Sequence, residues 1–435
     1  MGNHLKEYFR SKGTKDILVV SSGKIVASGL GFFASIILAR ELGPEDFGLF
    51  SLSLAMMIVI SGITGGSIDQ ATVKFSSFYL NRDKKKAELI FHTTFKIKII
   101  IGLFLLLAGL LISKPISRII FTEAGLEKLV TLSFIGAIGI IFMGYVLAFL
   151  QSHQTFGKHI LLEVLNNFMK LGIIGVMLLI NVLNPINSMV VFVVAPFLTF
   201  LVGLTIIPKT FLKTSNSHES LLPEIIHFSK WIVLSYIIFA MYRRMDIFLL
   251  NYLGEFQAVG IYSAAFIMAS MLDLVAVSLF VVVFPKVNRF ITRNEYVNFL
   301  TKFLTYAIPL YILTCVVFLC MSKFLVIKFY TADFADSVSI LRILVPGYAV
   351  YMIALPLSAI ILARNKPQLI VLIDFITLLV MFIGSISLIP LYGAKGAAVA
   401  ALISNLIFLI LIISWIIKEV RNIPSVESAP VMAGN

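Results

Sequence analysis

Ionisable side chains inside long apolar stretches are the residues of this chain that are best placed to do chemistry. The stretch "FAMYRRMDIFLLNYLG", residues 239–254, carries two adjacent arginines and an aspartate. A charged side chain at the centre of a bilayer costs about 2.5–3.5 kcal/mol on insertion scales, so such residues normally face a protein interior or a water-filled cavity. The positions of this kind are Lys24, Lys170, Arg243, Arg244, Asp246, Asp273 and Asp374.

The cations and the carboxylates of this set suit different tasks. Arginine presents a planar fork of donors that fits phosphate oxygens, and lysine acts as a point charge, so the four cations are candidate ligands of an anionic substrate. Lys24 lies near one end of its apolar stretch and could instead extend to the membrane surface. Arg243 and Asp246 are three residues apart and could pair within one helix, which leaves Arg244 for a substrate. The aspartates, such as Asp273, are either cation-coupling carboxylates or structural partners of basic side chains.

The composition decides the class of protein. Of the 435 residues, 59% are hydrophobic and 13% are charged, whereas soluble chains have about 45–50% apolar and about 25% charged residues. The chain is therefore predicted to be an integral membrane protein. Its net charge of +13 is explained by Lys and Arg in cytoplasmic loops, and no nucleic-acid motif accompanies it. No metal-ligand spacing and no phosphate-binding glycine loop occurs, so neither a metal nor a cofactor is expected.

Apolar stretches of about 20 residues, each long enough to cross a bilayer as a helix, divide the chain. We predict about twelve spans in an all-α polytopic fold, and an excess of Lys and Arg in alternate loops places both termini in the cytoplasm of a multi-pass plasma-membrane protein. Residues 69–86 are predicted to form an interfacial amphipathic helix with a basic turn. The spans lie near 17–39, 47–67, 89–112, 128–150, 160–181, 187–208, 226–250, 259–284, 303–327, 338–362, 368–390 and 394–417.

Two turns of similar sequence suggest that the chain is duplicated. "LGPEDFGLFS" (42–51) follows the first span, and "LGEFQAVGIYS" (253–263) follows the seventh. Both have Leu-Gly, a short polar turn, then Gly, any residue, an aromatic residue and Ser. The repeat predicts two pseudo-symmetric six-helix bundles, residues 1–213 and 214–435, with a substrate path between them. The motif residues are Arg40, Gly43, Gly48, Asp69, Gly254 and Gly260.

Longer segments around these turns resemble a known family. "ILARELGPEDFGLFSLSLA" (37–55), "GSIDQATVKF" (66–75) and "RRMDIFLLNYLGEFQAVGIYSAA" (243–265) are similar to the Wzx-type polysaccharide flippases of the multidrug/oligosaccharidyl-lipid/polysaccharide exporter superfamily. The resemblance implies two bundles around a central cavity with alternating access. It also implies movement of a polyprenyl-pyrophosphate-linked oligosaccharide from the cytoplasmic to the outer leaflet. Asp69 matches the family's acidic position after the second span, where it either caps a helix or takes part in transport.

Two other functions stay open beside the flippase. The first is a cation-coupled small-molecule or drug antiporter of the same superfamily, which would need net acidic groups in its cavity. The second is a membrane polysaccharide polymerase or ligase, which often has a long outer loop, whereas the predicted outer loops here are short. We expect no enzyme activity. The expected partners are a lipid-linked oligosaccharide, membrane lipids and either H⁺ or Na⁺, for a chain that works as a monomer beside polysaccharide-assembly proteins.

Overall fold

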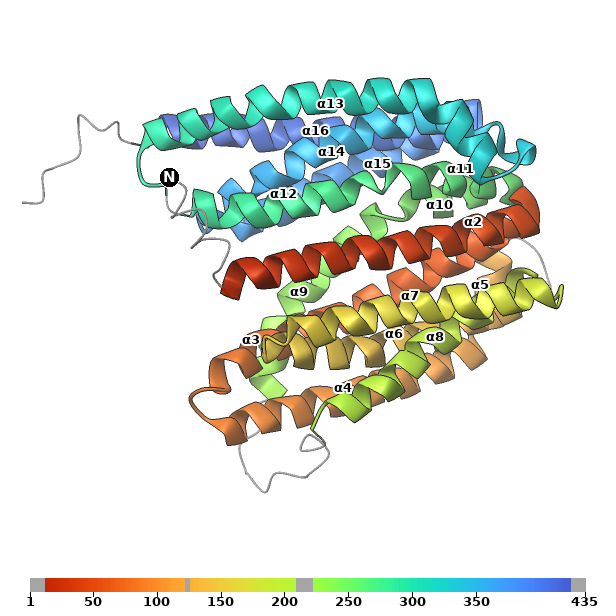
Figure 1. The fold of residues 1–435 in the computed structure, drawn as a ribbon, viewed down its shortest axis with the longest axis horizontal. Helices are drawn as coiled ribbons and strands as arrows, with labels where there is room; N and C mark the ends of the chain where they lie inside the picture. Colours follow the sequence, from red (N-terminus) through yellow and green to blue (C-terminus); the bar gives the residue numbers. More distant parts are fainter. Residues whose placement is uncertain (1–11, 122–125, 209–221, 289, 424–435) are drawn as a thin grey trace, which may run out of the picture. The chain divides into compact units, whose positions relative to one another are not determined.

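The computed structural model describes residues 12–121, 126–208, 222–288 and 290–423, and every element in these ranges is helical (Figure 1). The first seven long helices are α2 (Lys12–Ser61), α3 (Ser67–Tyr79), α4 (Lys84–Leu111), α5 (Ser113–Ile120), α6 (Glu127–Ser152), α7 (Phe156–Leu179) and α8 (Pro185–Ile206). The others are α9 (Leu222–Tyr242), α10 (Met245–Leu253), α11 (Phe256–Ala269), α12 (Leu272–Val287), α13 (Arg293–Phe329), α14 (Ser337–Ala363), α15 (Pro367–Tyr392) and α16 (Ala394–Arg421). A π-helical turn, Gly62–Gly66, joins α2 to α3, and a 3₁₀ turn, Ala332–Phe334, precedes α14.

Ten helices of the described residues are long and apolar enough to cross a membrane, which makes this a multi-pass membrane protein. The predicted spans 17–39 and 47–67 both lie in α2, where Gly43 interrupts the helical geometry with φ 72° and ψ 176°. A positive φ is readily adopted only by glycine, so the turn between these two spans depends on that residue. The predicted span 226–250 is divided between α9 and α10. Two of the twelve predicted spans thus share one long helix, and one is divided into two shorter helices, which leaves ten long helices.

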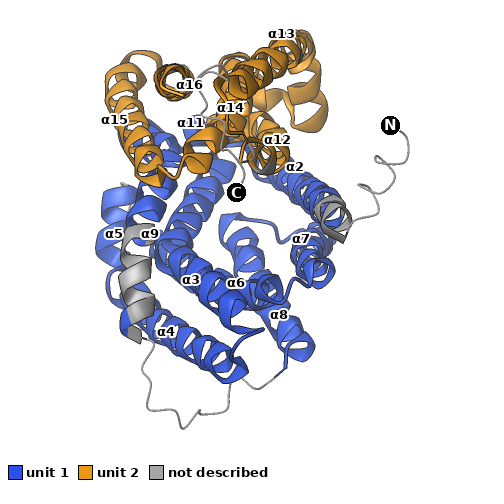
Figure 2. Ribbon diagram, turned by 90° about the vertical axis from the view of Figure 1, so that its left-hand side faces the viewer, with its two compact units in different colours: residues 1–260 blue, residues 261–435 orange. Residues whose placement is uncertain are grey.

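The chain forms two compact units, residues 1–260 and 261–435 (Figure 2). In the first unit α6 is central, because it packs against α2, α3, α4 and α8, while α2 packs along α7. In the second unit α14 packs against α12, α13 and α16, and α15 lies along α16. The predicted boundary between two six-helix bundles, at residues 213 and 214, lies outside the described residues, and the division into those bundles stays a prediction.

The two similar turns of the sequence meet within the first unit. A Cβ atom on Gly48 would collide with the carbonyl oxygen of Phe256, and a Cβ atom on Gly260 would collide with the carbonyl oxygen of Pro44. Gly48 lies four residues after Pro44, and Gly260 lies four residues after Phe256. Each glycine therefore approaches the segment that carries the other, and the two contacts are reciprocal. Such reciprocity is what a two-fold relation between duplicated helices would produce, and it gives both glycines the same task of close backbone approach.

The segment predicted to be an interfacial helix with a basic turn is a helix followed by a turn, and its position at the membrane interface stays a prediction. Residues 67–79 form α3, which continues from α2 through the π-helical turn and packs against α4, α6 and α9. The chain then turns at residues 80–83, and α4 begins at Lys84 with Asp83 as its N-cap, whose carboxylate accepts a hydrogen bond from the Lys86 backbone at 3.1 Å. Apart from Lys74 on α3, the basic residues of the segment therefore lie at this turn and at the start of α4, while α3 itself is part of the helical packing.

Candidate functional site

The four cations predicted to bind substrate lie at three places in the first unit: on α2, on α7 and in the turn between α9 and α10. Lys24 is exposed on α2, and Lys170 is half-buried on α7, with its Nζ atom 4.9 Å from the ring centroid of Phe192 on α8. A lysine over an aromatic face gains cation–π stabilisation, so Lys170 has a structural contact beside any role in binding. Arg243 and Arg244 are both half-buried in the turn between α9 and α10. The grouping of these four side chains around one cavity stays a prediction.

The prediction of one continuous helix across the two arginines is wrong. Helix α9 ends at Tyr242, Arg244 has φ −138° and ψ 0°, and α10 begins at the next residue. The hypothesis that Arg243 and Asp246 pair on one helical face assumed helical spacing, which this turn interrupts. Asp246 is buried in the first turn of α10, and its Oδ1 atom accepts a hydrogen bond from the Ile247 backbone at 2.8 Å. An acidic residue in the first turn is favoured by the helix dipole.

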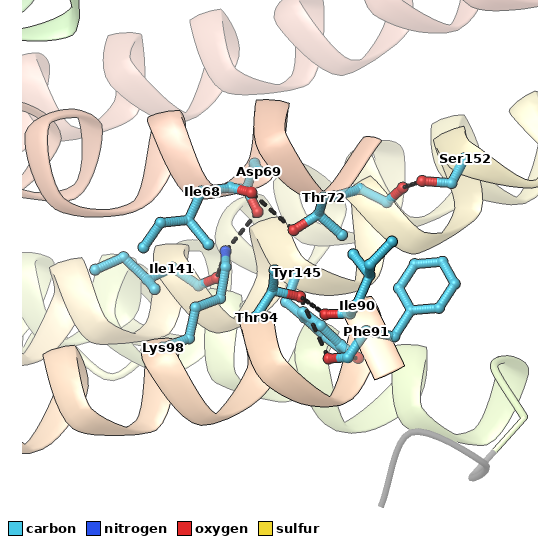
Figure 3. Close-up of polar contacts among 11 residues, drawn as sticks. Ile68, Asp69, Thr72, Ile90, Phe91, Thr94, Lys98, Ile141, Tyr145 and Ser152 are labelled. Atoms are coloured by element: carbon cyan, nitrogen blue, oxygen red, sulfur yellow. Dashed lines mark hydrogen bonds and ion pairs between the residues drawn. The ribbon is translucent and has the colours of Figure 1, made fainter. Parts of the chain in front are cut away.

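An ion pair joins α3 to α4 within the first unit (Figure 3). The Nζ atom of Lys98, on α4, donates hydrogen bonds to Oδ1 of Asp69 at 2.5 Å and to the carbonyl oxygen of Ile141, on α6, at 2.8 Å. The Lys98 side chain is 0% exposed, whereas that of Asp69 is 26% exposed. Lys98 is thus enclosed by its two partners, while one side of the Asp69 carboxylate remains accessible.

Close packing of α6 against α3 and α4 positions this pair. Tyr145 is fully buried and donates a hydrogen bond to the Phe91 carbonyl at 3.1 Å, which fixes α6 against α4 (Figure 3). A Cβ atom on Gly144 would lie 2.7 Å from Oδ2 of Asp69. Only glycine at this position leaves the carboxylate its present space, so the helix contact and the ion pair depend on each other.

Of the two roles predicted for Asp69, the structure contradicts one. Helix α3 begins without a side-chain cap, and Asp69 pairs with Lys98. A role of Asp69 in transport stays a prediction. Lys98 was missed, although it lies about 14 Å into the predicted span 89–112 at 1.5 Å per residue. The same argument that singled out Lys24 applies to Lys98, so the signal was present in the sequence.

The accessible side of Asp69 faces a cavity of about 550 Å³. Three helices form it. Helices α3 and α6 each contribute four residues, which are spaced so that they lie on one face of the helix, and α9 contributes one residue. Its lining residues are Asp69, Gln70, Val73, Lys74, Gly144, Leu147, Ala148, Gln151 and Tyr236, and we name it the α3–α6–α9 cavity. The Nε2 atom of Gln70 donates a hydrogen bond to the Tyr236 hydroxyl at 3.1 Å, which ties α3 to α9.

A second cavity, of about 510 Å³, lies where α4 begins and α6 ends. Its walls include Asn81, Lys84, Glu88 and the rings of Phe149 and His153, whose centroids are 4.2 Å apart. Neither of the two cavities is lined by Lys24, Lys170, Arg243 or Arg244. The polar walls of these two cavities are therefore made by residues other than the predicted ligands.

The remaining predicted carboxylates lie in the second unit. Asp273 is half-buried beside the break between α11 and α12, where its backbone donates to the Ser270 carbonyl at 3.0 Å, and Asp374 is half-buried on α15. Their roles in ion coupling or pairing stay predictions. Across the residues that the structure describes, no three His, Cys, Asp or Glu side chains gather in a way that could hold a metal ion.

The fold is shared with solved membrane transporters. A lipid II flippase, MurJ, in an inward closed conformation matches 93% of this chain and 90% of its own, with a TM-score of 0.77 and 16% identity. An inward-facing multidrug resistance MATE transporter of the MOP superfamily matches 91% and 95%, with a TM-score of 0.73 and 15% identity. A MOP superfamily transporter from Pyrococcus furiosus matches 95% and 98%, with a TM-score of 0.68 and 14% identity. These likenesses confirm the predicted fold class.

The sequence itself identifies the family. None of the curated protein sequences matches the chain. The profile of the family described as "Polysaccharide biosynthesis protein" matches residues 14–291, which include both similar turns, the ion pair and the α3–α6–α9 cavity. Since this match covers more than half of the chain, the protein belongs to the polysaccharide biosynthesis protein family.

Proposed function

We propose that this protein moves a polyprenyl-(pyro)phosphate-linked oligosaccharide from the cytoplasmic to the outer leaflet of the plasma membrane by alternating access. The observation that carries the proposal is the ion pair of Asp69 and the fully buried Lys98 inside the first unit, beside an open cavity that is lined with amide, hydroxyl and carboxylate groups. A purely structural bundle would bury apolar side chains there, because intramembrane charges are costly. Membership of a polysaccharide biosynthesis family supports a glycan-bearing substrate.

The proposed division of labour follows from charge. A lipid-linked sugar carries an anionic phosphate or pyrophosphate, which needs cationic donors, together with hydroxyl groups, which need neutral hydrogen-bonding partners. We assign binding of the anionic group to Lys24, Lys170, Arg243 and Arg244. We also propose that both termini of the chain lie in the cytoplasm. Flipping also requires that the substrate leave, so no single one of these contacts should hold it irreversibly.

A drug or small-molecule antiporter is the second candidate, because the fold matches a multidrug transporter nearly as well as it matches a flippase. A cationic drug requires an uncompensated acidic group in the cavity. In the α3–α6–α9 cavity the carboxylate of Asp69 is paired with Lys98, so this cavity offers no net negative charge. The charge balance therefore favours the glycan substrate.

Complementation of a host that lacks its own flippase tests the proposal. The wild-type chain should restore surface polysaccharide, and Arg243→Ala, Arg244→Ala and Lys24→Ala should each reduce the rate at which it appears. Arg421→Ala, at the exposed end of α16, is the matched control and should restore it fully. Full activity of all three variants would refute the proposed role of these cations in binding the phosphate. Rescue of drug resistance without rescue of polysaccharide would favour the antiporter.

A further inference from the structure

We infer that the α3–α6–α9 cavity binds an uncharged sugar unit of the glycan, apart from the cations assigned to the phosphate. This inference rests on the proposed function and names the part of the substrate that the cavity takes. It begins from the chemistry of the lining. Gln70 and Gln151 each offer an amide donor and an amide acceptor, Tyr236 offers a hydroxyl, and Asp69 offers carboxylate acceptors. Sugar hydroxyls both donate and accept, so they can satisfy all of these groups.

The charge of the cavity distinguishes a sugar from a phosphate. The ammonium of Lys98 is fully buried behind Asp69 and is shared between that carboxylate and the Ile141 carbonyl. It compensates the acidic charge without presenting a donor to the cavity. The cationic side chain that lines the cavity is Lys74, which is exposed, and the accessible oxygen of Asp69 would repel a phosphate. Pyrophosphate binding favours clustered or forked cations, and this lining has neither.

The same charge balance argues against a cation as the occupant. A carboxylate whose charge is compensated at 2.5 Å attracts a second cation only weakly. It remains a strong hydrogen-bond acceptor, because charge-assisted hydrogen bonds are about twice as strong as neutral ones. A neutral polyol therefore gains more from this carboxylate than an ion of either sign does.

Shape and positioning also fit a sugar. A volume of about 550 Å³ lies within the usual range of small-ligand pockets. The Tyr236 ring lies against the backbone at Gly66, where an added Cβ atom would come within 2.5 Å of it, and the Tyr236 hydroxyl is held by Gln70. Two of the polar groups are thus oriented before any ligand binds, which lowers the entropy cost of recognition.

Protection of an engineered cysteine tests the inference in the full chain. In a Cys315→Ser, Cys320→Ser background, Gln151→Cys places a thiol in the cavity, and Asn81→Cys places a matched thiol in the second cavity. Both are reconstituted in lipid nanodiscs and treated with a hydrophilic maleimide. The probes are lipid-linked oligosaccharide extracted from native membranes and undecaprenyl pyrophosphate, which has no sugar. Val73→Cys, on α3, is measured as a second reporter, because it keeps every polar group that is assigned to the sugar, including the Gln151 amide.

The expected result is slower labelling of the α3–α6–α9 cavity by the sugar-bearing probe alone. At about ten times its half-protecting concentration, this probe should slow labelling of Gln151→Cys about tenfold and leave Asn81→Cys unchanged. Equal protection by undecaprenyl pyrophosphate, or no protection by either probe, would overturn the inference. Flipping by the same chains in liposomes is measured in parallel. Flipping without protection would refute the sugar site but not the proposed function. Protection without flipping would refute the proposed function but not the sugar site.

Discussion

The Asp69–Lys98 pair gives an asymmetric prediction for stability. Lys98 is 0% exposed and Asp69 is 26% exposed. Removing either partner of a buried pair leaves an uncompensated charge, at a cost of about 3–5 kcal/mol. Asp69→Asn leaves the enclosed ammonium with the Ile141 carbonyl, so its cost should lie at the upper end, about 5 kcal/mol. Lys98→Met leaves a carboxylate that water in the cavity can reach, so its cost should be about 3 kcal/mol.

The double variant distinguishes the attraction between the two charges from the cost of burying each charge. At 2.5 Å, with an effective dielectric constant of about 20, the attraction between the two charges is about 7 kcal/mol. Desolvation costs several kcal/mol per ion, so the net contribution of the intact pair is small. The variant with both Asp69→Asn and Lys98→Met should therefore be more stable than either single variant, with a coupling energy of several kcal/mol.

Reversible unfolding by SDS in mixed micelles, followed by circular dichroism, measures these free energies. Lys96→Met is the matched control, because Lys96 lies on the same helix but is exposed, and it should change stability by less than about 0.5 kcal/mol. Equal costs for the two single variants, or a larger cost for Lys98→Met, would refute the argument from exposure. Additive costs in the double variant would show that the two charges do not stabilise each other.

Two further predictions concern glycines at close contacts. Gly48→Ala and Gly260→Ala should each destabilise the protein by about 1–3 kcal/mol in the same SDS titration, because the new methyl group meets a backbone carbonyl. Gly29→Ala is the control and should be neutral or stabilising, because its methyl group would meet nothing within 4 Å. A neutral Gly48→Ala would contradict the close approach. Gly144→Ala should displace the Asp69 carboxylate and slow lipid-linked oligosaccharide flipping in liposomes, and an unchanged rate would show that Asp69 tolerates a shift at this contact.

The sequence predicted most of the fold, because hydropathy and charge bias report directly on membrane crossing. It also marked the two glycine turns, since their spacing repeats. It did not predict the ion pair, whose members are 29 residues apart on different helices. Asp69 was placed in a surface segment because polar and basic residues follow it. Which faces of α3, α4 and α6 meet depends on tertiary packing, which periodicity does not determine.

The π-helical turn links the glycines of the second span to the ion pair. A π turn adds one residue to a helix, which rotates all later side chains by about 100° relative to an uninterrupted α-helix. In an uninterrupted α-helix the Asp69 side chain would therefore be turned by about 100° from the direction in which it now meets Lys98. Gly65 also allows close approach to Ile141, since an added Cβ atom would lie 2.8 Å from its side chain, and the Ile141 carbonyl is the second partner of Lys98. The glycine-containing π turn at the end of the second span thus helps to orient Asp69, the one acidic residue of α3, toward the buried lysine.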